Sequence, residues 1–118
     1  MIIKVLMYQV FPRQSPEDPY GNKEYKLKIL KDERKNIVKK ATQMLFRLYE
    51  GTGKAIYIIG IEDCGNARGI EKTELEKSIK NLQLIADELK AQLKNPRIYL
   101  GTDGLIATIR VTKDLFRI

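Results

Sequence analysis

A chain of 118 residues, 43% of them hydrophobic, has the size of one domain and can bury a core without disulfides or structural metal ions. It has no His and one Cys, Cys64, which excludes an internal disulfide, argues against a zinc site and favours a reducing compartment such as the cytoplasm. The net charge is +7, and residues 1–60 hold 12 Lys and Arg against 6 Asp and Glu. We expect a polyanionic partner, with nucleic acid as the first candidate and a merely solvated lysine surface as the alternative.

Composition also bears on membranes and on temperature. No stretch approaches the roughly 20 apolar residues of a membrane span, so we expect no membrane partner. The apolar residues 1–7 lack the basic leader and the cleavage site of a signal peptide. A content rich in Lys, Glu and Ile and poor in thermolabile residues indicates a thermophilic source.

The N-terminal third predicts two strands. Ile2–Phe11 is rich in β-branched and aromatic residues, and the prolines of Pro12–Gly21 predict a loop. Lys23–Leu30 alternates and predicts a second, half-buried strand, with Tyr25 on its core face. The other face, which we expect to meet solvent or a ligand, is fully charged: Glu24, Lys26 and Lys28.

A helix and a central strand come next. Asp32 is the predicted N-cap of a helix that ends at Glu50, because apolar residues recur there at helical spacing. Lys54–Ile61 is the most apolar segment and predicts a central strand covered on both faces. Glu62–Gly69 predicts a turn.

The C-terminal half predicts a long helix and a hairpin. The helix begins at Glu71 or Thr73, runs to Leu93 and is stopped by Asn95-Pro96. Two hairpin strands follow, over Arg97–Leu100 and Leu105–Thr112. The order β-β-α-β-α-β-β predicts an α/β (α+β) fold, a two-layer sandwich of a mixed β-sheet with two main helices on one face, as a single domain over residues 1–118.

The first helix carries an unbalanced run of cations. Its carboxylates, Asp32, Glu33 and Glu50, stand only at its ends. Such a helix can follow a phosphate backbone, although a solvated helix face is the alternative. The predicted nucleic-acid-binding residues are Arg34, Lys35, Lys39, Lys40 and Arg47.

Three acids form a candidate metal site. Glu24 lies within one predicted strand, and Glu62 and Asp63 follow another. Carboxylate oxygens are the ligands that Mg²⁺ and Mn²⁺ prefer, and such sites can be shared with phosphate. Glu24 and Asp63, with Lys26 beside them in the charged strand, are the catalytic candidates. The alternative is a charged strand face and a polar turn.

Two other features are not expected to bind phosphate or to take part in a reaction. Gly51-Thr52-Gly53-Lys54 lacks the full spacing of a phosphate-binding loop and leads from a helix into a strand, so it predicts a helix C-cap. Cys64 has no His to activate it and is expected to be half-buried.

Several separated motifs agree, in order, with one known group. Asn22-Lys23-Glu24-Tyr25-Lys26-Leu27-Lys28, Glu50-Gly51-Thr52-Gly53 and Ile59-Gly60-Ile61-Glu62-Asp63 resemble the N-terminal region of GTP-binding proteins related to translation elongation factors. The resemblance spans about Gly21 to Leu93. The GTPase domain that follows in that group has no counterpart here, so no GTP is expected.

The same core resembles, more distantly, the Schlafen-type AlbA-like domain. That resemblance implies RNA binding, with tRNA or rRNA as the RNA, and a divalent-metal-dependent endoribonuclease that uses an acidic trio. Glu24 matches one acid and Asp63, or Glu62, another. The third is expected where Pro19 stands, so it is Glu17, Asp18 or none.

We therefore expect a Schlafen-like RNA-binding domain, with a non-catalytic interaction module linked to translation as the alternative. We also expect a homodimer whose two basic helices flank one RNA site, because a single lobe offers a shallow surface and two-fold pairing is the commonest assembly. The tail Asp114–Ile118 is a candidate part of that contact.

Overall fold

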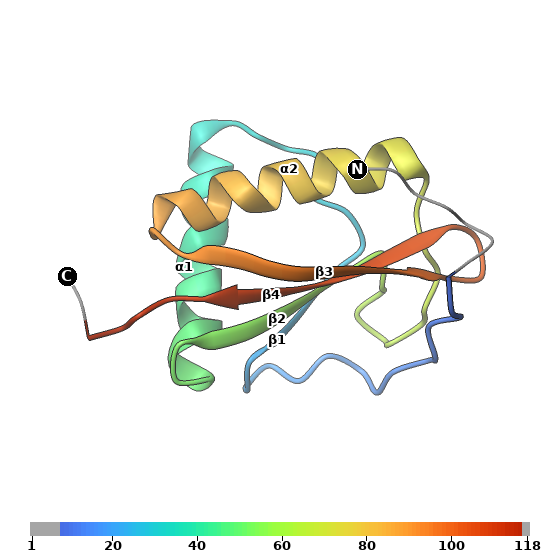
Figure 1. Cartoon of the computed structure of the whole chain (residues 1–118), viewed down its shortest axis with the longest axis horizontal. Helices are drawn as coiled ribbons and strands as arrows, with labels where there is room; N and C mark the ends of the chain where they lie inside the picture. Colours follow the sequence, from blue (N-terminus) through green and yellow to red (C-terminus); the bar gives the residue numbers. More distant parts are fainter. Residues whose placement is uncertain (1–7, 117–118) are drawn as a thin grey trace.

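The computed structural model of the chain describes residues 8–116. Its elements, in chain order, are β1 (Lys23–Lys26), α1 (Arg34–Glu50), β2 (Lys54–Ile59), α2 (Lys72–Glu88), β3 (Gln92–Leu100) and β4 (Leu105–Thr112). The sheet order is β1-β2-β4-β3, with β1 parallel to β2 and the other neighbours antiparallel. Both helices lie on one side of this mixed sheet (Figure 1), so the predicted two-layer sandwich is confirmed. Neither helix is long and apolar enough to cross a membrane.

The main core lies between the helices and one face of the sheet. Alternate residues of the central strands β2 and β4 point to the helices, among them Tyr57, Ile59 and Ile109. Met44 of α1 and Leu82 of α2 meet them and are fully buried. The period of two in the strands and of about 3.6 in the helices therefore brings the apolar side chains together.

The other face of the sheet carries a smaller apolar cluster. Tyr25, Ile58 and Ile106 are buried there, and Tyr25 is a core residue as predicted. The loop before β1 covers this cluster, since the Tyr25 hydroxyl donates to the Ser15 carbonyl at 2.9 Å. The cover stops at the β3 and β4 side, where the face stays open.

The first predicted strand, Ile2–Phe11, lies partly outside the described residues. From residue 8 on, it makes one isolated parallel bridge, between Val10 and Leu100. The Phe11 N–H donates to the Leu100 carbonyl, and the Leu100 N–H donates to the Gln9 carbonyl, both at 2.8 Å. The segment thus runs along the end of β3.

The predicted boundary between α2 and β3 is wrong. The helix ends at Glu88, and Lys90 adopts a left-handed φ of 55° that breaks it. Leu93, predicted as the last helical residue, pairs with Val111 in the sheet. Asn95-Pro96 does not stop the helix but sits at an irregularity of β3, where a missing proline N–H costs no ladder hydrogen bond.

The segment between β1 and α1 also differs from the prediction. β1 ends at Lys26, and residue 33, not Asp32, is the N-cap of α1, without a side-chain cap. Two polar side chains of α2 hold the connecting backbone instead. The Ile29 N–H donates to Ser78 Oγ at 2.9 Å, and Asn81 Nδ2 donates to the Ile29 carbonyl at 2.8 Å.

Candidate functional site

Glu24 is locked into the interior by an arginine. It points to the helix side of the sheet, where Arg47 of α1 donates from Nε to Glu24 Oε1 at 2.9 Å. Both residues are only 3% exposed. The expectation that Glu24 faces solvent or a ligand is therefore wrong, because α1 covers this face of β1 and supplies a counter-charge.

Arg47 also ties down the loop before β1. Its two terminal nitrogens donate to the carbonyls of Asp18, Tyr20 and Gly21 at 2.9 to 3.0 Å. A planar guanidinium can serve one carboxylate and several carbonyls at once, which suits it to a structural junction. Arg47 therefore joins α1, β1 and the loop, and its charge is not presented to solvent.

Two more charged residues border this pair. Glu17 accepts from the Tyr25 N–H and lies 3.9 Å from Arg47 Nη2. Burial, and the neighbouring charge of Glu24, raise the pKa of Glu17 above its ordinary value. Lys26 Nζ lies 3.6 Å from Glu24 Oε2. Glu17, not Asp18, is thus the acid that joins Glu24, and the Asp18 carboxylate accepts from the Tyr20 N–H.

Glu62 and Asp63 do not complete a metal site with Glu24. Glu62 Oε1 accepts from Asn66 Nδ2 at 2.6 Å, while Asp63 is exposed in the turn. Across residues 8–116, no three acids, cysteines or histidines are grouped so that they could hold a metal ion. The residues therefore do not fit the Mg²⁺ or Mn²⁺ that the Schlafen-type resemblance implies. Cys64, expected to be half-buried, is exposed.

The five cations of α1 do not act as one surface. Arg34 donates through both terminal nitrogens to Glu88 of α2, at 2.6 and 2.7 Å, and Arg47 is buried. Lys35 and Lys39 are exposed. Lys40 is half-buried, and burial together with neighbouring lysines lowers its pKa. Three lysines of α1 thus stay available to a phosphate backbone.

A second group of cations was missed by the sequence analysis. They project from the sheet face opposite the helices, and we call this group the cationic sheet face: Lys23, Lys54, Lys94, Arg97 and Arg110. They come from all four strands, so no local run of sequence marks them. The available signal was the alternation in β3 and β4, where Lys94 and Arg110 occupy the outward phase.

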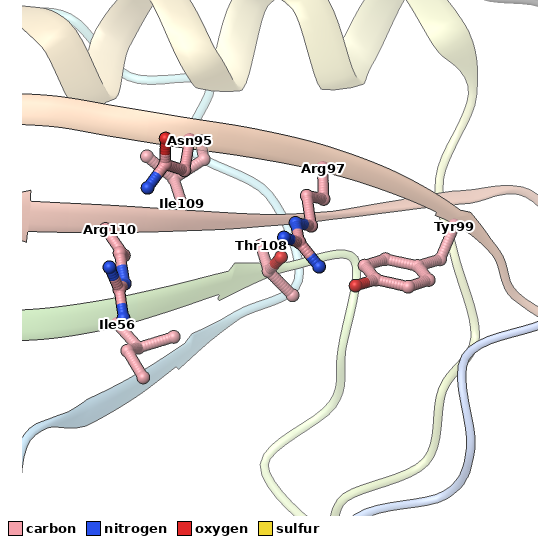
Figure 2. A pocket seen from close by; sticks show the side chains of 7 residues that line it. All are labelled: Ile56, Asn95, Arg97, Tyr99, Thr108, Ile109 and Arg110. Atoms are coloured by element: carbon pink, nitrogen blue, oxygen red, sulfur yellow. The ribbon is translucent and has the colours of Figure 1, made fainter. Parts of the chain in front are cut away.

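The open part of this face is hollowed. Figure 2 shows Arg97 and Arg110 standing on either side of Thr108, with Tyr99 next to Arg97 and Ile56 below Arg110. The hollow holds about 320 Å³. The Tyr99 ring packs edge-on against Phe11, with 5.1 Å between the ring centroids. An apolar floor, two guanidinium groups and a tyrosine thus share one concave surface.

Comparison with known proteins gives one kind of match. GTP-binding protein 2 of mouse and GTP-binding protein 2 of human are each 39% identical to this chain over 82 residues, or 70% of the chain. The chain spans 14% of the length of these relatives. No protein-family model and no solved structure matches it. The resemblance to a GTP-binding protein is confirmed, the Schlafen-type resemblance gains no support, and the chain is similar to one segment of GTP-binding protein 2.

Proposed function

We propose that this chain is a non-catalytic, RNA-binding interaction module linked to translation, comparable to the matched segment of GTP-binding protein 2. The observation that carries the non-catalytic part is the buried pair of Glu24 and Arg47. The best candidate for a catalytic acid is occupied by a structural partner. Glu17 lies beside it, but no third acid within residues 8–116 completes a metal ligand set.

The competing proposal is a metal-dependent endoribonuclease. It requires a Glu24 carboxylate that can reach a metal ion and a phosphate. Arg47 holds Oε1 of Glu24, and Lys26 borders Oε2. Breaking a buried ion pair on one side costs about 3–5 kcal/mol. Glu24 therefore serves better as part of the scaffold than as a ligand.

RNA is the partner that the charge supports best. The chain carries a net charge of +7, and most lysines and arginines within residues 8–116 are exposed. Electrostatic contacts with phosphates supply most of the sequence-independent affinity of nucleic-acid-binding proteins. The proposed link to translation follows the resemblance to GTP-binding proteins related to elongation factors, and it points to tRNA or rRNA.

The test measures binding and cleavage in one experiment. Labelled tRNA and rRNA fragments are incubated with the purified chain, with and without Mn²⁺ or Mg²⁺, and followed by anisotropy and on a denaturing gel. We expect binding that weakens as salt rises, and RNA of unchanged length. Cleavage that Asp63→Asn abolishes would overturn the non-catalytic proposal, since Asp63 is exposed and its substitution leaves the core intact. No binding to either RNA at low salt would overturn the RNA part.

A further inference from the structure

The cationic sheet face is arranged in cross-strand rows. One row runs Lys23, Ile56, Arg110, Lys94 across all four strands. The next row runs Tyr25, Ile58, Thr108, Arg97, and Tyr99 stands opposite Ile106 in the row after it. None of these outward positions is acidic. Cations and the partly exposed Tyr99 therefore stand beside a floor of apolar and hydroxyl-bearing side chains, in which Tyr25 is buried.

These cations have no partners among residues 8–116. No side chain of the cationic sheet face makes an ion pair or a hydrogen bond to any residue from 8 to 116. Some cations elsewhere are paired, as in Lys28 with Glu74 at 2.8 Å, whereas Lys35 and Lys39 of α1 make no ion pair with residues 8–116 either. Lys94 and Arg110 are even direct cross-strand neighbours, and like charges in that position destabilise a sheet. A bound anion would reduce this repulsion between Lys94 and Arg110.

The basic surface continues beyond the first hollow. A second hollow of about 560 Å³ lies at the end of the sheet near Gly53. Its charged lining residues are four lysines and one acid: Lys54, Lys90, Lys94, Lys113 and Asp114. Lys94 belongs to the outward row of the cationic sheet face, so the two hollows follow one another along β3 and β4. An extended anion can therefore run from Tyr99 over Arg97 and Arg110 to the lysines.

The side chains of the cationic sheet face favour single-stranded RNA over a duplex. A tyrosine ring and guanidinium planes stack on exposed bases, and cations beside them hold the phosphates, which is how proteins grip single-stranded RNA. In a duplex the bases are paired and stacked on one another, so an aromatic ring on a sheet cannot stack on them. The packing of Phe11 fixes the Tyr99 ring before any ligand arrives.

We propose that the cationic sheet face binds a single-stranded stretch of RNA, with a base stacked on Tyr99 and phosphates on Arg97, Arg110 and Lys94. This inference rests on the proposed RNA-binding function and assigns it a surface and a ligand class. It places the main contact on the sheet and not on the lysines of α1.

The test compares two variants with equal loss of charge. Lys94, Arg97 and Arg110 are changed to Gln in the sheet triple variant, and Lys35, Lys39 and Lys40 in the helix triple variant. All but Lys40 are exposed, so both should fold, which circular dichroism melting checks. Affinity for a labelled single-stranded RNA of about twelve nucleotides is measured by anisotropy across a salt series. The sheet triple variant should lower the slope of log affinity against log salt by about 2, at 0.7 per lost phosphate contact.

Substitutions of Tyr99 give a second measurement, because their effect on affinity does not depend on the charge of the protein. Tyr99→Ala should weaken binding about 5- to 150-fold, the usual worth of one stacked base, and leave the salt slope unchanged. Tyr99→Phe should bind like the wild type. A duplex of the same sequence should bind more weakly than the single strand.

The outcomes separate this inference from the proposed function. If the wild type binds no RNA, the proposed function itself is wrong. If the helix triple variant loses binding while the sheet triple variant and Tyr99→Ala keep it, the chain binds RNA but the sheet-face assignment is overturned. Equal losses in both triple variants, with Tyr99→Ala unaffected, overturn it as well, because binding is then a property of net charge.

Discussion

The junction at Arg47 gives the sharpest prediction about stability. Arg47→Met keeps an unbranched side chain in the same space but removes the guanidinium. It abolishes four hydrogen bonds, to the Glu24 carboxylate and to the carbonyls of Asp18, Tyr20 and Gly21. The Glu24 carboxylate is then buried with only Lys26, 3.6 Å away, as a counter-charge.

The expected loss is a large share of the total stability. Removing one side of a buried ion pair costs about 3–5 kcal/mol, against about 5–15 kcal/mol for a whole domain. At roughly 4 °C per kcal/mol for a chain of this size, the Tm should fall by about 12–20 °C. Urea denaturation and thermal melting followed by circular dichroism measure both quantities.

The chain contains its own control for this substitution. Arg34 lies on the same helix and pairs with Glu88, but its side chain is 74% exposed. Exposed pairs are worth about 0–1 kcal/mol, so Arg34→Met should change the free energy of unfolding little. If Arg47→Met were as mild as Arg34→Met, Glu24 would not depend on Arg47 in solution. Glu24 would then not be a scaffold residue.

Three further predictions concern pH, backbone contacts and assembly. Burial raises the pKa of Glu17 in the folded chain. As pH rises, the Glu17 carboxyl therefore loses its proton at a lower pH in the unfolded chain than in the folded chain. Glu17→Gln should therefore gain stability relative to the wild type as pH rises through 4.5 and above, and an opposite trend in denaturation curves would contradict this. Ser78→Ala should cost about 1–3 kcal/mol, because it leaves the buried Ile29 N–H without its acceptor, and a loss below 0.5 kcal/mol would count against that contact. The homodimer stays a prediction, and light scattering should give twice the 13.6 kDa of one chain; the single mass would end the model of a groove shared by two copies.

The sequence pattern was sufficient for the layers of the fold. Alternation in β2 and β4 and helical spacing in α1 and α2 predicted which side chains pack together, and Met44, Tyr57 and Leu82 are buried as that pattern requires. The helical periodicity gave a wrong prediction where it continued past the end of α2. Leu93 kept the helical spacing of α2, yet the left-handed Lys90 had already turned the chain into β3.

The site was harder to predict because its contacts join distant residues. Glu24 and Arg47 are 23 positions apart, and each looked like a surface residue until α1 was placed over β1. The cationic sheet face was missed for a related reason. Lys23, Arg97 and Arg110 come together only through the strand order β1-β2-β4-β3, which the sequence does not specify. The distribution of charge along the sequence predicted α1 as the nucleic-acid-binding surface, because its cations are neighbours in sequence.

The RNA contact can be located by an NMR titration of the chain with single-stranded RNA, followed at the backbone amide and the arginine Nε–H resonances. We predict saturable shifts for Arg97 and Arg110, which are exposed on the open face and make no ion pair with residues 8–116. Arg34, held by Glu88, and the buried Arg47 should stay in place. Shifts confined to amides of α1, or no shifts at RNA concentrations well above that of the protein, would contradict the proposal that this module binds RNA on its sheet.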